Sequence, residues 1–238
     1  MYKIYVKEQR YKDLLVLKNL RCNIDEGDFV VIMGESGCGK TTFLNVISGL
    51  LLGYEGEIYF EDNDISKKSS NQLLDFRREN LGMIFQDFKL IDFLNVEENI
   101  RIINKSLKDN ELDKILNRLE ISDIQQKTIN QCSGGQKQRV AIARVLAGKK
   151  RIILADEPTA SLDSRTSKEI MDIFLELNKE GYTIVMITHS PQIASYANRI
   201  LYLYEGSFKE ERNMKDMDQK EKLKEIIGII EKHYDKCI

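Results

Sequence analysis

Apolar residues in the first third of the chain follow patterns typical of β-strands. Three stretches show this, two by alternation with polar residues and one as a continuous run: Ile4 and Val6, Leu15 and Leu17, and residues 29–33. Alternation is typical of a half-buried strand, and a short apolar run before a glycine is typical of a fully buried one. Residues 58–60 predict a further strand, and the polar residues 62–70 predict a surface connection.

The middle of the chain has a helical period, and the last third alternates between helix and strand. Residues 41–50 carry apolar residues at i, i+1, i+4 and i+7, which predicts a helix directly after a glycine-rich loop. The pattern is mostly helical from about residue 92 to 144. Beyond it, strands are predicted at 151–155, 183–188 and 200–204, and helices at 167–177 and 191–197. Strands that alternate with helices indicate an α/β fold with a parallel sheet.

The last thirty residues differ from the rest in their density of charge. Within them, five residues fall on one helical stripe: Leu223, Ile226, Ile227, Ile230 and Tyr234. We therefore expect residues 209–238 to form a charged helical tail that packs on its own domain. Contact of this stripe with a partner protein is the alternative.

Composition narrows the class of protein without identifying it. The 238 residues allow one large domain or two small ones, and 42% hydrophobic with 31% charged residues is typical of a soluble globular chain. No run approaches the roughly 18 apolar residues of a spanning helix, and residues 1–12 lack the apolar core of a secretory signal, so we expect a cytoplasmic protein. The net charge of -2 disfavours non-specific nucleic-acid binding. Four scattered cysteines and two histidines predict neither a disulfide framework nor a zinc site.

A glycine-rich loop supplies the first candidate chemistry. Residues 34–41, GESGCGKT, match the phosphate-loop pattern GxxxxGK[ST] and lie between a predicted strand and a predicted helix. Backbone N–H groups and the helix N-terminus would surround nucleotide phosphates, Lys40 would add a positive charge, and Thr41 would offer a hydroxyl to Mg2+. The flanking strand and helix make a chance match a weak alternative.

Two further motifs fit a phosphate-transferring site. Asp156 and Glu157 follow the apolar run 152–155, so both are predicted at the carboxyl edge of the sheet, where ligands bind in α/β folds. Asp156 would hold Mg2+ and Glu157 would polarise water, although an isolated pair of this kind is as often a solvated loop. Residues 133–136, SGGQ, predict a loop that opens a helix and offers a second anion-binding terminus; alone, this sequence is also typical of an ordinary turn.

In their order along residues 3–208, these motifs resemble one family closely: the nucleotide-binding domain of ATP-binding cassette (ABC) transporters. Four more residues resemble markers of that family. Tyr11 is similar to the aromatic residue that stacks on adenine, Gln86 to the Q-loop glutamine, Asp163 to the D-loop aspartate and His189 to the switch histidine. Tyr2 and Tyr5 are alternatives for the adenine contact, and the family's spacing favours Tyr11.

The resemblance implies a set of site residues. Contacts with ATP are implied for Tyr11, Gly34, Glu35, Ser36, Gly37, Cys38, Gly39, Lys40, Thr41 and Thr42. The signature, which acts on the nucleotide of a second chain, is implied to be Ser133, Gly134, Gly135 and Gln136, and the D-loop contributes Asp163. Catalysis is implied for Glu157, His189 and Gln86, and Mg2+ ligation for Thr41, Gln86 and Asp156.

The resemblance also implies the architecture and the partners. It predicts an α/β P-loop NTPase (RecA-like) core with a mostly parallel sheet, an N-terminal antiparallel β subdomain and an inserted helical subdomain at about 92–144, all within a nucleotide-binding domain of residues 1–208. ATP and Mg2+ are the implied cofactors. The implied partners are a second ATPase domain, in a homodimer or heterodimer, and separate transmembrane permease subunits that hold the chain on the inner face of the cell membrane. No nucleic-acid partner is expected.

Two residues depart from the family pattern. Cys132 stands where the signature usually begins with leucine, which changes helix packing more than the role of Ser133. Cys38 stands in the phosphate loop where serine is more usual, and we expect its thiol to be sensitive to oxidation.

The predicted function is the ATP-hydrolysing motor of a transporter. Residues 81–100, together with 162–164 and 187–190, resemble the ATPases of the macrolide and antimicrobial-peptide export, lipoprotein-release and cell-division group, which favours an exporter. A soluble ABC-type ATPase of DNA repair or translation is the alternative. A repair ATPase carries a long coiled coil between the phosphate loop and the signature, and a translation factor carries two cassettes; this sequence has no sustained heptad run and one cassette.

Overall fold

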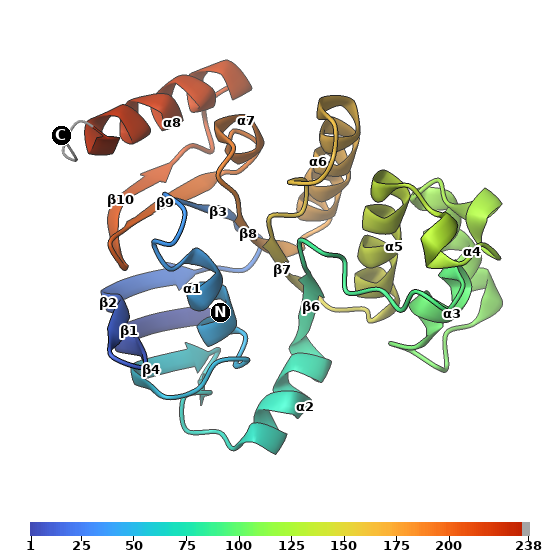
Figure 1. The fold of residues 1–238 in the computed structure, drawn as a ribbon, viewed down its shortest axis with the longest axis horizontal. Helices are drawn as coiled ribbons and strands as arrows, with labels where there is room; N and C mark the ends of the chain where they lie inside the picture. Colours follow the sequence, from blue (N-terminus) through green and yellow to red (C-terminus); the bar gives the residue numbers. More distant parts are fainter. Residues whose placement is uncertain (235–238) are drawn as a thin grey trace.

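The computed structural model describes residues 1–234 and contains two β-sheets (Figure 1). The smaller sheet is antiparallel and has the strand order β2-β1-β4-β5. Its strands are β1 (Tyr2–Tyr11), β2 (Leu14–Ile24), β4 (Tyr54–Phe60) and β5 (Asn63–Asp64). The alternation of Ile4 and Val6 with charged residues places both side chains on the buried face of this sheet.

The larger sheet is mostly parallel and has the order β10-β9-β3-β8-β7-β6. Its strands are β3 (Phe29–Met33), β6 (Leu81–Ile84), β7 (Ile152–Asp156), β8 (Thr183–Ile187), β9 (Arg199–Tyr204) and β10 (Ser207–Asn213). Only the hairpin of β9 and β10 is antiparallel among the pairs of this sheet in residues 1–234. Strands β3, β7 and β8 are almost entirely apolar, as expected for strands buried on both faces.

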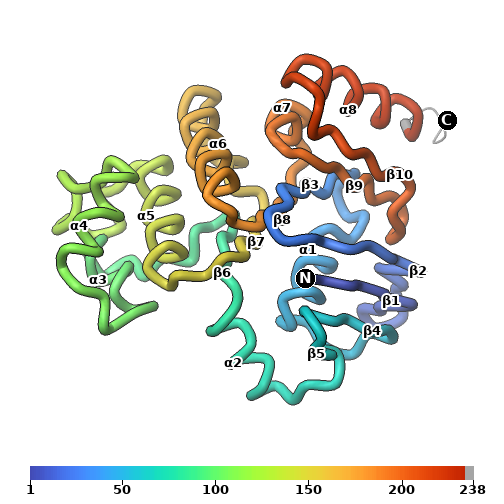
Figure 2. The backbone as a smooth tube through the Cα atoms, turned by 180° about the vertical axis from the view of Figure 1, so that it is seen from behind, coloured from blue at the N-terminus to red at the C-terminus, as the bar shows by residue number. Residues whose placement is uncertain are grey.

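The helices lie on both faces of the larger sheet and in a separate group at its β6 edge (Figures 1 and 2). Their bounds are α1 (Lys40–Ile47), α2 (Ser70–Asn80), α3 (Val96–Arg101), α4 (Asp109–Arg118), α5 (Gly134–Ala147), α6 (Ser164–Lys179), α7 (Pro191–Ala194) and α8 (Gln219–Tyr234), with short 3-10 helices at Ser122–Ile124 and Ile129–Gln131. Both views place α3, α4 and α5 on the opposite side of β6 and β7 from α1. No helix in residues 1–234 is long and apolar enough to cross a membrane.

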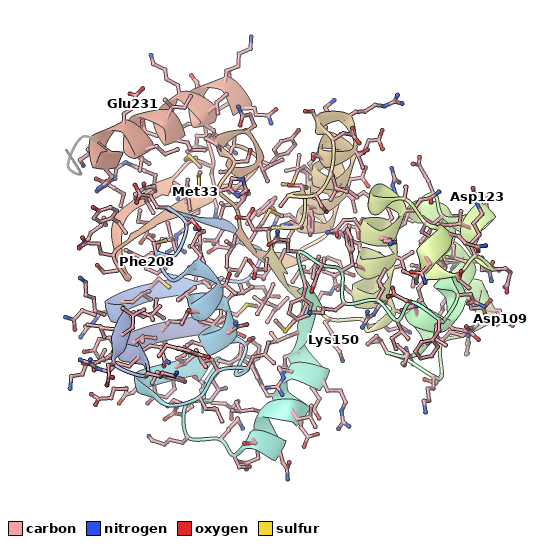
Figure 3. The ribbon with its side chains drawn as sticks, viewed as in Figure 1. Met33, Asp109, Asp123, Lys150, Phe208 and Glu231 are labelled. Atoms are coloured by element: carbon pink, nitrogen blue, oxygen red, sulfur yellow. The ribbon has the colours of Figure 1, made fainter. Side chains whose placement is uncertain are left out.

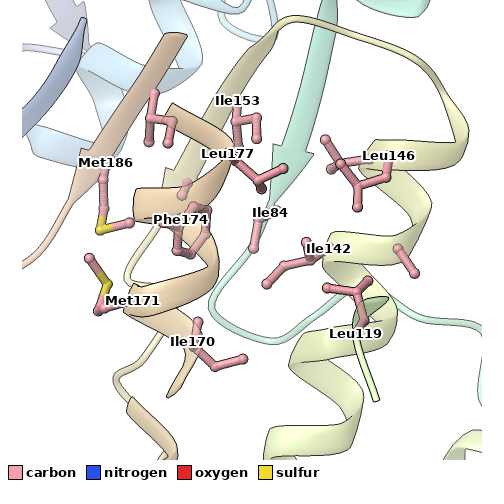
Figure 4. Packing of buried hydrophobic residues seen from close by; sticks show 14 of the residues in the cluster. Ile84, Leu119, Ile142, Leu146, Ile153, Ile170, Met171, Phe174, Leu177 and Met186 are labelled. Atoms are coloured by element: carbon pink, nitrogen blue, oxygen red, sulfur yellow. The ribbon is translucent and has the colours of Figure 1, made fainter. Parts of the chain in front are cut away.

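Two hydrophobic clusters hold these layers together. In one, α1 packs between the two sheets, and the ring of Phe43 meets that of Phe208 edge to face at 5.3 Å (Figure 3 labels Phe208). In the other, the opposite face of the larger sheet packs against α5 and α6; Ile142 and Phe174 lie beside Ile84 in Figure 4. The helical group therefore contacts the core through apolar side chains of α5.

The predicted α/β class, with a mostly parallel sheet, an antiparallel N-terminal sheet and inserted helices, is confirmed. Helix α2 was not predicted, because the polar run before it continues through its first turn. The segment predicted as a helical tail from residue 209 is strand as far as Asn213, so the boundary predicted at residue 208 falls inside β10.

The stripe predicted to pack α8 on its own domain needs a correction. Ile226 is fully buried, but Ile227 is 41% exposed. The buried positions are Lys222, Ile226, Ile229 and His233, which repeat at helical spacing along a neighbouring face. Apart from Ile227 and Gly228, the exposed residues of α8 are polar or charged, and Glu231 is one of them (Figure 3). Packing of α8 on the chain itself is confirmed: Ile226 and Ile230 of the predicted stripe pack on the core, together with Lys222, Ile229 and His233, while the side chain of Tyr234 lies outside the described part of the structure.

Candidate functional site

Four neighbouring parallel strands bring the predicted site residues to one edge of the larger sheet. In the order β3-β8-β7-β6, the strands are followed by Gly34, His189, Glu157 and Gln86. Asp156, the last residue of β7, is in register with Ile187 of β8. Because the carboxyl ends of parallel strands share one edge, residues separated by more than 150 positions become neighbours.

Lys40, the first residue of α1, folds back into the loop that precedes it. Its Nζ donates to the backbone oxygens of Gly34 at 2.8 Å and Glu35 at 2.7 Å, and lies 3.9 Å from the sulfur of Cys38. The lysine is only 9% exposed, and Gly39 precedes it as the helix N-cap. An ammonium group held at a helix N-terminus within a loop of backbone N–H groups is suited to a multiply charged phosphate.

Gly34 is required at the start of this loop by a close approach of backbone to backbone. It has φ +155, and a Cβ at this position would lie 2.1 Å from the backbone oxygen of Leu203 in β9. No side chain fits in that space. The loop is therefore packed directly against the neighbouring strand, which fixes its position relative to the sheet edge.

Thr41 and Asp156 face one another across the loop and the end of β7. The hydroxyl Oγ1 of Thr41 donates to Oδ1 of Asp156 at 3.4 Å. Burial raises the pKa of the Asp156 carboxyl, and the hydrogen bond from Thr41 opposes this effect in part. A hydroxyl beside a carboxylate offers the oxygen ligands that Mg2+ prefers. Two protein ligands are enough for this ion, because waters and phosphate oxygens fill its other coordination positions.

Glu157 and His189 form the second contact at this edge. Nδ1 of His189 lies 2.9 Å from Oε1 of Glu157, and the glutamate side chain is 14% exposed. Glu157 has φ 47, a left-handed conformation that is uncommon outside glycine and costs of order 1–3 kcal/mol. Its backbone N–H donates to the oxygen of Ile187 at 3.0 Å, which helps to hold this turn. A cavity of about 510 Å³ adjoins the pair and extends between α6 and α7.

Two predicted residues lie exposed at the margin of the site. Gln86 follows β6 in a loop in which Phe88 and Lys89 both have positive φ. Tyr11 is 69% exposed at the tip of the β1–β2 hairpin, and β2 passes beside the phosphate loop, where Leu17 is adjacent to Gly39. Tyr2 is buried and Tyr5 packs under Arg21 with the guanidinium 4.2 Å from the ring, so Tyr11 is the tyrosine of the three that is open to a ligand.

The SGGQ motif forms the start of α5, as predicted, but not within the same site. Ser133 is the N-cap, its hydroxyl accepts from the backbone N–H of Gln136 at 3.3 Å, and the Gln136 side chain accepts from the N–H of Ser133 at 2.9 Å. This capping box leaves further N–H groups at the helix start available to a ligand. Helix α5 and the phosphate loop's helix α1 lie on opposite sides of β6 and β7 (Figure 1).

Asp163 caps α6, the helix that follows the end of β7. Its carboxylate accepts from the backbone N–H groups of Arg165 and Thr166, both at 3.0 Å, and from the Thr166 hydroxyl at 2.6 Å. The hydrogen bond from the Thr166 hydroxyl is the main cause of its lowered pKa. Asp163 is therefore occupied in fixing the start of α6.

The environment of Cys38 differs from the sequence-based expectation. The thiol is half-buried, and burial raises its pKa more than nearby Lys40 lowers it. A raised pKa favours the protonated thiol, which is the unreactive form. Cys132 is buried at the N-terminal side of α5, and its sulfur lies 3.5 Å from the Thr128 oxygen. Neither cysteine has the surroundings of an activated thiol.

Comparison with known proteins agrees with this geometry. The profile of the family described as ABC transporter matches residues 17–160. The chain belongs to the ABC transporter family. It is 36% identical over 219 residues to the bacitracin export ATP-binding protein BceA of Halalkalibacterium halodurans, a match that covers 89% of this chain and 87% of BceA. It is 39% identical over 197 residues to the macrolide export ATP-binding/permease protein MacB of Campylobacter jejuni serotype O:2, which covers 80% of this chain and 31% of MacB.

A solved structure supports the same assignment. The ATP-binding cassette MJ0796, in a dimeric post-hydrolysis state bound to ADP and Pi, superposes with a TM-score of 0.81 at 38% identity. The superposition covers 99% of that chain and 90% of this one. This ABC protein is thus an ATP-binding subunit with ATPase activity, and its fold is that of an ABC cassette.

Proposed function

We propose that the chain binds ATP with Mg2+ at the edge formed by β3, β8 and β7, and that Glu157 is its general base. The observation that carries this proposal is a pair of contacts made by consecutive residues at the end of β7: Asp156 contacts Thr41 of α1, and Glu157 contacts His189 after β8. Gly34 to Thr42 would surround the phosphates, Tyr11 would stack on adenine, and Thr41, Asp156 and Gln86 would hold the metal. The ion would supply charge neutralisation on the terminal phosphates.

Each residue of the site has a separate role in phosphoryl transfer. Lys40 now donates to two backbone oxygens of its own loop, so phosphate oxygens replace those acceptors when nucleotide binds. Glu157 accepts the proton of the attacking water, and its imidazole partner His189 is positioned to donate to the terminal phosphate. The rigid turn at Glu157 keeps the carboxylate at the sheet edge before substrate arrives.

The signature is proposed to complete the site of a second chain. Ser133 and the N-terminus of α5 can bind an anion, yet they lie away from the phosphate loop of their own chain. Two chains related by a two-fold axis would place each Ser133 against the other chain's nucleotide, in either a homodimer or a heterodimer. The dimeric cassette structure of MJ0796 supports this arrangement.

The transported cargo is proposed to leave the cell. BceA is named for bacitracin export and MacB for macrolide export, which favours an exporter of peptide or antibiotic type. The chain matches less than a third of MacB, a protein named as both ATP-binding and permease. Separate permease subunits would then hold this chain on the inner face of the membrane. Phe93, 82% exposed between Gln86 and α3, is a suitable contact for an apolar side chain of such a subunit.

The Glu157→Gln variant tests the catalytic role directly. Glutamine keeps the shape of the side chain but cannot accept a proton, so ATP turnover should fall roughly 10²–10⁴-fold while ATP still binds. The variant should also form an ATP-dependent dimer that size-exclusion chromatography detects. A variant with near-normal turnover would remove Glu157 from the role of general base.

A further inference from the structure

Helix α8 is tied to the segment that follows the switch histidine. Nζ of Lys222 donates to the backbone oxygen of Ala197 at 2.8 Å and to Oδ1 of Asn198 at 3.3 Å. One turn earlier, the amide of Gln219 donates to the hydroxyl of Ser195 at 3.3 Å. All three acceptors lie between α7 and β9. The N-terminal half of α8 therefore clamps the connection that leaves α7.

The other half of α8 is anchored to the sheet. Ile226 and Ile229 are buried in the hydrophobic cluster that also contains residues of α7. Near the C-terminal end, the ring of His233 stacks on Tyr202 of β9 at 5.0 Å, and Lys232 pairs with Glu210 of β10. Because one end of α8 is held by β9 and β10, its other end can support α7 as a fixed element.

Support of this kind matters because α7 is too short to hold its own position. It has four residues, and its N-cap, Ser190, directly follows His189. Isolated helices shorter than about 12 residues are marginal in water, so packing determines where such a turn lies. Movement of α7 would change the backbone of His189 and hence its contact with Glu157.

Lys222 is an unusual residue for a purely structural contact. It is 8% exposed, and no ion pair joins it to a carboxylate within residues 1–234. Burial lowers its pKa. Placing an ammonium group in such surroundings is costly unless its hydrogen bonds are well formed, which makes its geometry strict. The position of the Ala197 backbone is fixed as a result.

A part of this chain about as long as α8 and its connection has no counterpart in MJ0796. That chain is covered over 99% of its length, while a tenth of this chain has no counterpart in it. Helix α8, with its 16 residues and the connection before it, is about as long as this uncovered tenth.

We propose that α8 positions the switch loop, with Lys222 as the positioning residue that acts through α7 on His189. This inference rests on the role of His189 proposed above. Lys222 does not touch nucleotide. It restricts the backbone from Ser195 to Asn198, and so keeps the imidazole within reach of Glu157 and the terminal phosphate.

The test compares two lysine substitutions on the same helix of the full chain. Lys222→Met keeps the unbranched apolar stem but removes both hydrogen bonds, and Lys224→Met is the matched control at an exposed position. We expect Lys222→Met to lower kcat about ten-fold, with KM for ATP within two-fold of the unmodified chain, and Lys224→Met to change neither. Lys222→Gln retains a donor and should keep more of the turnover.

Two further measurements separate positioning from simple stability. Amide hydrogen exchange over residues 189–198 should be faster in Lys222→Met than in Lys224→Met, while exchange of the phosphate-loop helix stays unchanged. With Glu157→Gln added, the Lys222→Met chain should still form its ATP-dependent dimer. Turnover within two-fold of the Lys224→Met chain would overturn the proposal, and so would loss of ATP binding together with kcat, because the lysine would then support the whole fold.

The His189→Ala variant shows which of the two proposals fails. If His189→Ala abolishes turnover but Lys222→Met does not, α8 has no positioning role and the proposed site stands. If His189→Ala retains near-normal turnover, the proposed role of His189 fails, and the positioning role of α8 fails with it.

Discussion

Asp156 and Glu157 are neighbours in sequence but occupy different surroundings. Asp156 ends β7, faces Thr41, and has a pKa that burial raises. Glu157 starts a strained turn with φ 47 and faces His189. One carboxylate is thus placed beside Thr41 of the loop and the other beside His189. This division arises where β7 ends, because Asp156 is the last residue of the strand and Glu157 leaves it in a left-handed conformation.

Asp156→Asn should stabilise the nucleotide-free chain while it abolishes Mg2+-dependent hydrolysis. Asparagine keeps an acceptor for the Thr41 hydroxyl and removes a carboxylate that is unfavourable to ionise in the folded state. Because burial raises the folded-state pKa above its ordinary value of 3.8, the folded chain binds this proton more tightly than the unfolded chain. The aspartate therefore lowers stability as the pH rises through that window, and asparagine does not.

Denaturant unfolding at a series of pH values measures this effect. The stability advantage of Asp156→Asn should be absent well below pH 3.8, where Asp156 is protonated in both the folded and the unfolded chain. The advantage should be present at pH 7. Hydrolysis should fall on the order of a hundred-fold or more. A variant that is less stable than the unmodified chain at pH 7 would contradict the expected sign.

The sequence predicts the site's residues where local motif and strand order suffice. Lys40 and Thr41 follow from the loop pattern, and Asp156 from its place after an apolar run. It does not reveal Lys222, because a lysine in a charged tail is typical of a solvated face and its buried bonds to Ala197 and Asn198 depend on tertiary packing. The surroundings of Cys38 were likewise a consequence of how the loop packs.

At the scale of elements, the signature helix is packed closely on the helix that the D-loop begins. A Cβ on Gly134 would lie 3.2 Å from Leu162, and one on Gly135 would lie 2.5 Å from Cγ2 of Thr166. Arg139 of α5 pairs with Glu169 of α6 at 3.0 Å. The two helix starts therefore behave as one unit within the chain, in addition to any role of the glycines toward a second chain's nucleotide.

Gly135→Ala should therefore destabilise the chain even without nucleotide. The added methyl group collides with the Thr166 methyl group, and overpacking of this kind costs about 1–3 kcal/mol. Thr166→Ser removes the methyl group and keeps a hydroxyl for Asp163, so the double variant should recover most of the loss. Urea denaturation of the unmodified chain, the two single variants and the double variant gives the coupling free energy between residues 135 and 166. Equal losses with threonine and serine would show that the collision is not the cause.

Elements differ in how well the sequence predicts them for a physical reason. Strands β3, β7 and β8 are buried on both faces and show continuous apolar runs. Helix α2 has only Leu73 and Phe76 buried, which is too weak a period to detect. Strand β10, with the sequence SFKEERN, is an edge strand rich in charge, and its pairing with β9 rather than its composition makes it a strand.

At the scale of the molecule, the proposed site consists of two parts that lie on opposite sides of β6 and β7. The phosphate loop, Asp156 and Glu157 share one sheet edge, and Ser133 begins a helix beyond β6 and β7 (Figure 2). The sequence predicted both halves from motifs, but their separation is a property of the fold. Under the proposed function, a chain arranged in this way needs a second copy, or a related ATPase, to complete each nucleotide site.

The separation predicts complementation between two different defects. In a mixed dimer of a Lys40→Ala chain and a Ser133→Arg chain, one site carries both lesions and the other has an intact phosphate loop and an intact signature. Glu157→Gln is added to both chains to prevent hydrolysis. Each variant alone should then remain monomeric with ATP, because every site of its dimer would lack either Lys40 or Ser133.

Mixing the two variants should restore an ATP-dependent dimer, since a single complete site binds nucleotide between the chains. Size-exclusion chromatography with one chain labelled distinguishes this mixed species from either monomer. A chain carrying both Lys40→Ala and Ser133→Arg, mixed with itself, is the control and should never dimerise. If the mixture stays monomeric while Glu157→Gln alone dimerises, Ser133 does not complete the partner's site. If Glu157→Gln alone also stays monomeric, the second half of the site comes from a different ATPase chain.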